Sequence, residues 1–166
     1  MELISDEYKQ VLIKEHELTK WGMSGCTFKD FITKKCQKLN IDNILDYGSG
    51  QGLLKKALEP NISVTNYDPG IVDFSILPDR HNFVVCMDVL EHVEEDYVDN
   101  VINHLHSLTG TMLLVTVATT KALRILNNGV NAHITIKDIN WWEEKFLKHF
   151  NIVGIEHGYV YVLEPK

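Results

Sequence analysis

The segment that most constrains the fold of this chain is Asp46-Tyr47-Gly48-Ser49-Gly50-Gln51-Gly52. It ends a pattern over residues 41–47 that predicts a buried strand, and it precedes residues 53–58, which favour a short helix. Glycine at alternate positions lets the backbone turn tightly and approach a ligand without obstruction by side chains. A strand, a glycine loop and a helix in this order indicate a ligand at the carboxyl edge of a parallel sheet, although a tight structural turn would have the same letters.

Strand and helix patterns alternate along the rest of the chain. Helices are predicted over residues 6–20, 27–39, 98–108 and 138–150, and strands over 62–67, 83–87 and 112–117, with two more between 152 and 163 around Gly158. Thr27 and Asp138 are the expected N-caps of two helices. The alternation predicts an α/β, Rossmann-like three-layer sandwich with helices on both faces of a mostly parallel sheet. We expect one domain overall, with residues 1–40 as an N-terminal helical segment packed on a core of residues 41–166.

Composition excludes several kinds of partner. The formal net charge of the 166 residues is −7, which argues against a surface built to neutralise the phosphates of a nucleic acid. Cys26, Cys36 and Cys86 are odd in number and lack metal-binding spacing, which favours a reducing compartment. No apolar run approaches the roughly 20 residues that span a bilayer, and the acidic N-terminus does not resemble a signal peptide. We therefore expect a soluble, cytoplasmic protein with no nucleic-acid or membrane partner.

Asp68 lies where an acid that binds a ribose is expected. It follows the strand predicted over residues 62–67 and comes roughly twenty residues after the glycine loop. A carboxylate there can accept hydrogen bonds from both ribose hydroxyls, whether the ligand is NAD or adenosylmethionine. Dinucleotide folds prefer G-x-G-x-x-G, whereas residue 53 is Leu and an acid, Asp46, precedes the first glycine. These features favour the methyl donor, which has no pyrophosphate but carries an ammonium and a sulfonium.

From about residue 40 onward the chain resembles the class I S-adenosylmethionine-dependent methyltransferases, whose D-x-G-x-G-x-G motif is complete in residues 46–52. The resemblance implies that Gly48 and Gly50 line the methionine part of the cofactor and that Asp68 holds the ribose. It also implies that residues 88–90 lie beside the donor methyl. The implied cofactor site comprises Asp46, Tyr47, Gly48, Ser49, Gly50, Asp68, Pro69, Asp88 and Val89.

Residues 88–92, Asp-Val-Leu-Glu-His, are similar to the D-V-L-E-H signature of the branch that includes the ubiquinone-biosynthesis O-methyltransferases. Residues 133–135, ahead of a Trp-rich helix, also resemble that branch, and the hairpin of residues 152–163 resembles the antiparallel last strand pair of the fold. The resemblance implies a methyltransferase acting on a small soluble acceptor, and it favours transfer to oxygen over transfer to nitrogen.

Residues 69–82 depart from the family pattern, because they are too few for the usual helix and third strand. That strand is expected to be missing or vestigial, so the adenine pocket must be built from other residues. The candidates near Asp68 are Pro69, Ile71, Phe74, Ile76 and Leu77, with Asp73 as the nearest acid.

Four polar side chains are candidates for the methyl-transfer site. Asp88, Glu91 and His92 follow one predicted strand and His133 follows the next, so the fold could bring them together. In one interpretation Glu91, His92 and His133 are catalytic, with a histidine as the general base. In another, all four hold a divalent cation that acidifies an acceptor hydroxyl. A structural alternative has Glu91 capping the next helix and His92 packing on the sheet.

The metal interpretation has a parallel in the small-RNA 2′-O-methyltransferases, whose E-x-x-E-H motif with a distant His is similar to residues 88–92 with His133. Here the first acid is Asp88, which is one methylene shorter than Glu.

Two further groups of residues are less specific signals. Trp21, Trp141, Trp142, Tyr47 and Tyr97 could cover a planar acceptor, although helical spacing favours core packing for Trp142, and Lys121, Arg124 and Asn131 could meet an anionic group.

Two other classes of protein share these features. An NAD-dependent oxidoreductase would use the same glycine loop and Asp68, but the sequence offers no set of residues for hydride transfer. A protein that binds adenosylmethionine without transferring its methyl group would keep the cofactor motifs alone. A homodimer that completes the pocket is also compatible with a shortened fold.

Overall fold

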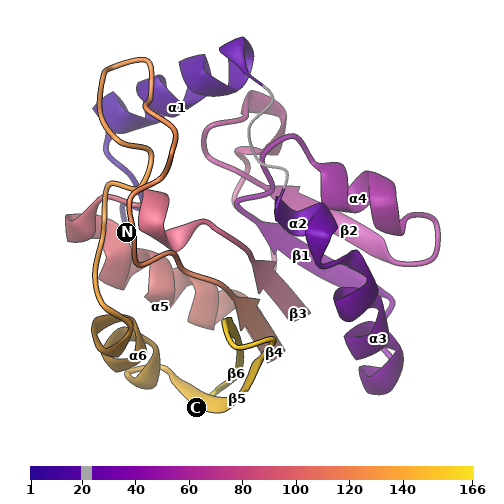
Figure 1. Ribbon diagram of the computed structural model, residues 1–166. Helices are drawn as coiled ribbons and strands as arrows, with labels where there is room; N and C mark the ends of the chain where they lie inside the picture. Colours follow the sequence, from indigo (N-terminus) through magenta and orange to yellow (C-terminus); the bar gives the residue numbers. More distant parts are fainter. Residues whose placement is uncertain (20–23) are drawn as a thin grey trace.

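The structure, a computed structural model, describes residues 1–19 and 24–166. Within these residues six strands form one mixed sheet in the order β2-β1-β3-β4-β6-β5 (Figure 1). The strands are β1 (Asn43–Tyr47), β2 (Ser63–Tyr67), β3 (His81–Cys86), β4 (Thr109–Val115), β5 (Phe150–Glu156) and β6 (Val160–Pro165). Neighbours among β1 to β4 are parallel, whereas β6 runs antiparallel to both β4 and β5. The predicted Rossmann-like sheet with an antiparallel final hairpin is confirmed.

Helices cover both faces of this sheet. The helices of the described residues are α1 (Asp6–Leu18), α2 (Ser24–Thr27), α3 (Lys29–Leu39), α4 (Leu53–Leu58), α5 (Val98–Leu108) and α6 (Ile139–Leu147), with short 3₁₀ turns η1 (Val72–Phe74), η2 (Leu90–His92) and η3 (Glu95–Tyr97). Alternate side chains of β3 enter opposite cores: Val84 packs with α5 and α6, whereas Phe83 and Val85 pack with α3 and α4. Because both faces of residues 83–86 are buried, this part of the strand is a continuous apolar run.

The first helix, α1, packs away from both of these cores. Its residues Tyr8 and Leu12 form a separate apolar cluster with Leu126 and Ala132, which lie in the long segment between β4 and α6. Figure 1 shows α1 beside this segment, at the end of the molecule opposite the final hairpin. The N-terminal segment therefore contacts a part of the chain more than a hundred residues away in sequence.

Local signals at helix ends were only partly reliable. The predicted cap Asp138 accepts a hydrogen bond from the backbone N–H of Trp141 at 2.9 Å. The predicted cap Thr27 is wrong, because it ends α2, and α3 begins after Phe28 without a side-chain cap. No helix among the described residues is long and apolar enough to cross a membrane.

The connection between β2 and β3 is short and is described in full. Its one regular element is η1, so no strand lies between Tyr67 and His81 in this part of the chain. As a result β2 is an edge strand whose strand neighbour is β1.

Candidate active site

The glycine loop turns sharply between β1 and α4. Gly48, Gly50 and Gly52 have positive φ angles of 75°, 49° and 65°, which glycine adopts without steric cost. The backbone N–H groups of Gly48 and Ser49 both donate to the carbonyl of Tyr67 at the end of β2. A Cβ on Gly48 would lie 2.4 Å from Cγ2 of Val89, so this position also needs glycine for the close approach of the chain after β3.

Asp68 joins the glycine loop to the end of β2. Its Oδ2 accepts from the backbone N–H of Gly50 and its Oδ1 from that of Gly70, both at 2.8 Å. The residue is 6% exposed. Each carboxylate oxygen can accept more than one hydrogen bond, so both can still accept from a ligand hydroxyl.

A second acid, Asp46, is the penultimate residue of β1 and is buried. Burial, together with the nearby charge of Asp68, raises the pKa of Asp46 to about 7. Two carboxyl groups of adjacent strands therefore lie close together in a poorly solvated place. Such a pair favours a ligand that brings positive charge.

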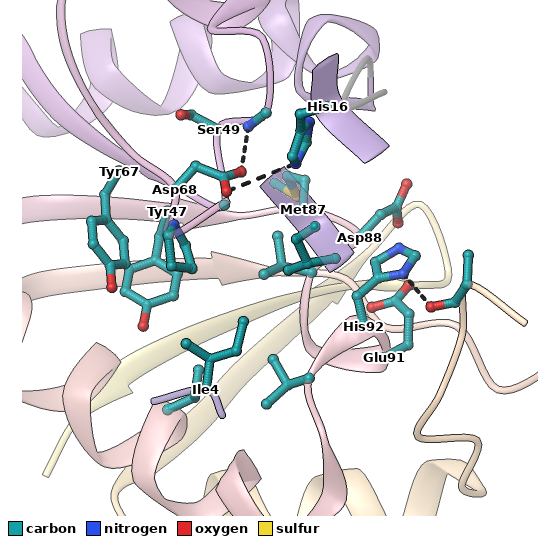
Figure 2. A pocket seen from close by; sticks show the side chains of 18 of the residues that line it. Ile4, His16, Tyr47, Ser49, Tyr67, Asp68, Met87, Asp88, Glu91 and His92 are labelled. Atoms are coloured by element: carbon teal, nitrogen blue, oxygen red, sulfur yellow. Dashed lines mark hydrogen bonds and ion pairs between the residues drawn. The ribbon is translucent and has the colours of Figure 1, made fainter. Parts of the chain in front are cut away.

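These residues line a cavity of about 350 Å³ at the carboxyl edge of the sheet (Figure 2). Every residue of the implied cofactor site is part of its wall: Asp46, Tyr47, Gly48, Ser49, Gly50, Asp68, Pro69, Asp88 and Val89. The same cavity is lined by Glu91, His92 and His133, and by Leu3, Ile4, Leu12 and His16 from the N-terminal segment. The adenine candidates Ile71, Asp73, Phe74, Ile76 and Leu77 are not part of its wall, nor are Lys121 and Asn131.

Glu91, His92 and His133 form a compact cluster in this wall. They offer ligand atoms that all lie within 4.8 Å of one another, and the two imidazole rings are 4.9 Å apart. Asp88 does not belong to this group, contrary to the four-residue metal site predicted from the sequence. Its φ of 54° is left-handed, and its Oδ1 accepts a hydrogen bond from Oγ1 of Thr116 at 2.8 Å.

Backbone carbonyls fix the tautomers of both histidines. Nδ1 of His92 lies 2.7 Å from the carbonyl oxygen of Ala132, and Nδ1 of His133 lies 2.6 Å from that of Thr120. Because a carbonyl can only accept, each neutral ring carries its proton on Nδ1 and its lone pair on Nε2. Burial lowers the pKa of His92 to about 4, so its ring is neutral at physiological pH.

Glu91 is the fully buried member of the cluster. Its Oε1 accepts from the backbone N–H of Ala118, which follows β4, at 2.9 Å. Its Oε2 is buried and has no hydrogen-bond partner among the described residues. Burial, and secondarily the charge of Asp88, raise the pKa of Glu91 to about 8. The predicted capping role is wrong, because this carboxyl contacts the chain after β4 instead of a helix N-terminus.

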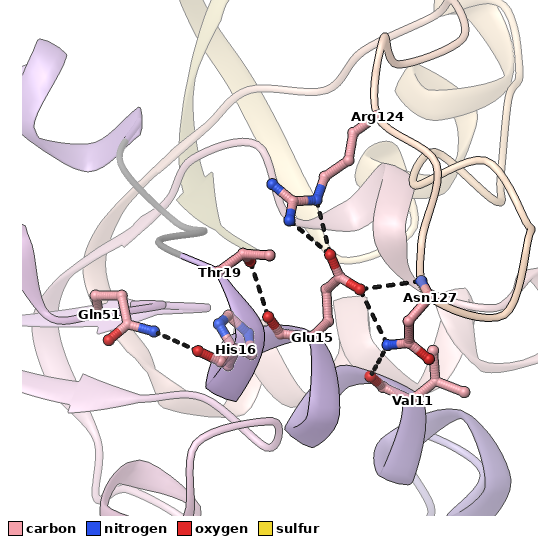
Figure 3. Close-up of polar contacts among 7 residues, drawn as sticks. All are labelled: Val11, Glu15, His16, Thr19, Gln51, Arg124 and Asn127. Atoms are coloured by element: carbon pink, nitrogen blue, oxygen red, sulfur yellow. Dashed lines mark hydrogen bonds and ion pairs between the residues drawn. The ribbon is translucent and has the colours of Figure 1, made fainter.

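An ionic network that the sequence analysis missed ties α1 to the segment after β4 (Figure 3). Oε1 of Glu15 accepts from Nε and Nη2 of Arg124 at 2.9 and 2.6 Å. Oε2 of Glu15 accepts from the backbone N–H and from Nδ2 of Asn127, both at 3.0 Å. A signal was present in the sequence: Glu15 occupies the same helical stripe as the buried Tyr8 and Leu12. A charged residue at such a position needs a partner.

The predicted aromatic cover does not form among the described residues. Trp142 is fully buried and stacks with Phe146 in the core, as the helical spacing favoured. Of the other candidates Tyr47 lines the cavity, whereas Trp141 and Tyr97 do not, and Trp21 lies outside the described residues.

Comparison with known proteins identifies a family. The family model described as "Methyltransferase domain" matches residues 15–157. A direct search of curated protein sequences gave no match.

Solved structures with a similar fold include three methyltransferases. The 1,6-didemethyltoxoflavin-N1-methyltransferase of Burkholderia thailandensis, with bound 1,6-didemethyltoxoflavin and S-adenosylhomocysteine, has a TM-score of 0.64 and 15% identity over 99% of this chain and 90% of its own. The N-methyltransferase NodS of Bradyrhizobium japonicum WM9, in complex with S-adenosylhomocysteine, has a TM-score of 0.61 and 13% identity over 96% of this chain and 99% of its own. The magnesium protoporphyrin IX methyltransferase ChlM of Synechocystis PCC 6803, with bound adenosylmethionine, has a TM-score of 0.56 and 15% identity over 96% of this chain and 88% of its own. At these identities the likeness shows the fold alone.

Proposed function

This chain belongs to the methyltransferase-domain family, and from that premise we propose that it transfers a methyl group from S-adenosylmethionine to a small acceptor bound beside Glu91, His92 and His133. The observation that carries the proposal is the single cavity that joins the glycine loop and Asp68 to this cluster. A cofactor held at one end would meet an acceptor held at the other.

The residues present fit the cofactor. Gly48 lines the cavity without a side chain that could obstruct a ligand, and a Cβ at this position would clash with Val89. Asp46 and Asp68 provide a carboxyl pair that suits a cationic ligand bearing ribose hydroxyls. When bound, adenosylmethionine supplies an electrophilic methyl group on a positively charged sulfur.

For transfer to oxygen, we assign His92 as the general base. Its Nδ1 proton is held by Ala132, so Nε2 has the lone pair that accepts the proton of an acceptor hydroxyl. In such a transfer Nε2 of His92 would take the hydroxyl proton as the oxygen takes the methyl group and the sulfonium becomes a thioether. The imidazolium of His92 would then lose its proton to solvent. His133 and Glu91 lie close enough to orient the acceptor, and alignment of the reacting atoms supplies most of the catalysis.

Oxygen is favoured over nitrogen because a neutral base suits a protonated hydroxyl, whereas a neutral amine needs less help. Two of the similar solved structures carry N-methyltransferase names, so an amine acceptor is the alternative outcome.

We also propose that the third strand of the family fold is absent here, because β2 is an edge strand and residues 68–80 contain η1 alone among regular elements.

A second candidate role for the cluster is to bind a divalent cation. A carboxylate with two imidazole nitrogens is a common ligand set, and Glu91, His92 and His133 offer ligand atoms within 4.8 Å of one another. Glu91 would have to lose its proton to take part, because its pKa is raised to about 8.

Calorimetric titration with adenosylmethionine, S-adenosylhomocysteine and NAD tests the cofactor. We expect one molecule of either adenosyl ligand to bind per chain and NAD to bind weakly or not at all. Tight binding of NAD with no response to the other two would contradict the proposal.

The role of His92 is tested with an acceptor found in a panel of small hydroxyl-bearing and amine-bearing molecules, assayed by mass spectrometry. His92→Gln should lower kcat by about a hundredfold or more, with little change in the affinity for S-adenosylhomocysteine. A chelator separates the two roles: activity that survives EDTA supports the base, and activity that is lost and then restored by added Mn²⁺ supports the cation.

A further inference from the structure

His16 is placed by α1 at the end of the cavity where Asp68 lies. The two side chains point toward one another, as Figure 2 shows, and Nε2 of His16 is 3.9 Å from Oδ1 of Asp68. Both side chains are nearly buried, with 7% and 9% of their surface exposed. His16 also lines the cavity wall, although sequence patterns gave it no role.

Close packing fixes the position of this histidine. A Cβ on Gly70 would lie 3.0 Å from Cδ2 of His16 and 3.0 Å from Cβ of Leu12, so α1 rests directly on the turn after β2. Nε2 of Gln51, in the glycine loop, donates to the carbonyl of His16 at 3.4 Å. The neighbouring Glu15 is held by Arg124 and Asn127 (Figure 3). These contacts hold the backbone of α1 at His16 beside the glycine loop and the turn after β2, so the ring lies next to Asp68.

The separation of the two side chains is too long for a direct hydrogen bond and suits a bridging hydroxyl. A hydrogen bond between these groups spans about 2.8 Å. If a ligand oxygen lay at about that distance from both Nε2 of His16 and Oδ1 of Asp68, the angle between the two hydrogen bonds at that oxygen would be roughly a right angle. A hydroxyl tolerates this angle when it donates to one atom and accepts from the other.

We propose that His16 is a further cofactor-binding residue, whose Nε2–H donates to the ribose hydroxyl that donates to Oδ1 of Asp68. The proposal rests on the proposed function, because it takes Asp68 to hold the cofactor ribose. It makes α1 part of the cofactor site, so the site combines the N-terminal helix with the ends of β1 and β2. The same helix, α1, also carries Glu15, which binds Arg124 in the segment that contains Ala132 and His133.

The test measures dissociation constants of S-adenosylhomocysteine and of its 2′-deoxy and 3′-deoxy analogues by calorimetry. His16→Phe keeps a ring of similar size and removes the N–H donor, whereas His16→Gln keeps a donor at a similar reach. His149→Phe, in the turn between α6 and β5 and outside the cavity wall, is the matched control. Thermal unfolding of each variant checks that it is folded.

We expect His16→Phe to weaken binding of S-adenosylhomocysteine about three- to tenfold, which corresponds to one lost hydrogen bond. For the deoxy analogue that lacks the bridged hydroxyl, wild type and His16→Phe should bind alike, and His16→Gln should recover much of the lost affinity.

Two results would overturn the inference alone. One is an unchanged affinity of His16→Phe for S-adenosylhomocysteine, and the other is an equal loss for all three ligands, which would indicate a packing role. Failure of the wild-type protein to bind S-adenosylhomocysteine would instead refute the proposed function, and the inference with it.

Discussion

At the scale of single residues, the site depends on backbone conformations that few residues adopt. Gly48 has a left-handed backbone and lies close to Val89. Its role could be predicted because glycine at three alternate positions indicates a tight loop with unusual backbone angles. Asp88 is left-handed as well, but aspartate at a strand end carries no such signal. Thr116 accepts from the N–H of Asp88 and donates to its carboxylate, both at 2.8 Å. The carboxylate of Asp88 is thus paired with Thr116, and it is not part of the cluster with Glu91.

Gly48 needs glycine for two reasons, its positive φ and the close approach of Val89, and substitution separates them. Gly129 also has a positive φ, of 82°, but a Cβ there would meet nothing within 4 Å. We expect Gly129→Ala to lower the free energy of unfolding by about 1–2 kcal/mol, the cost of the conformation alone. Gly48→Ala should cost clearly more, because its Cβ would also clash with Val89, and it should weaken binding of S-adenosylhomocysteine. Urea unfolding of the two variants is the measurement, and equal losses would show that the clash is relieved without cost.

At the scale of elements, α1 is the helix whose position in the fold is hardest to predict from its sequence pattern. Its helical character could be predicted from periodicity, and it spans Asp6–Leu18 against the predicted 6–20. Its place could not, because it depends on contacts of Glu15 with residues more than a hundred positions away. Local sequence patterns contain no information on such pairs unless a buried charge is recognised as needing a partner.

Glu15→Gln tests how strongly this network holds α1. Burial acts to raise the pKa of Glu15, but hydrogen bonds from Arg124 and Asn127 outweigh it and the pKa is lowered. Because the folded pKa lies below the unfolded one, the carboxylate stabilises the fold above the ordinary pKa of Glu and this contribution is lost as the pH falls through the folded value. The variant should lose about 1–3 kcal/mol at pH 7, since Arg124 is partly exposed and the network is screened.

Glu17→Gln, at an exposed position of the same helix, is the control for Glu15→Gln. Urea unfolding at pH 7 and in acid is the measurement. The difference between wild type and Glu15→Gln should shrink in acid, and a difference that stays constant with pH would mean that the charge of Glu15 has no part in it.

At the scale of the whole molecule, the sheet and the meeting of the glycine loop with Asp68 could be predicted, and the geometry of the cluster of Glu91, His92 and His133 only in part. Buried strands and their glycine loop have local signatures, and parallel strands bring Asp46 and Asp68 to one edge without further information. The cluster of Glu91, His92 and His133 also follows from strand order. Its tautomers do not, because they depend on carbonyls of Ala132 and Thr120 in an irregular segment.

The most direct test of the account is a crystal structure of the protein with S-adenosylhomocysteine. We expect ribose hydroxyls on Asp68, with His16 on one of them, and the cofactor sulfur directed toward Glu91, His92 and His133. A ribose bound away from Asp68, or a sulfur directed away from this cluster, would contradict it.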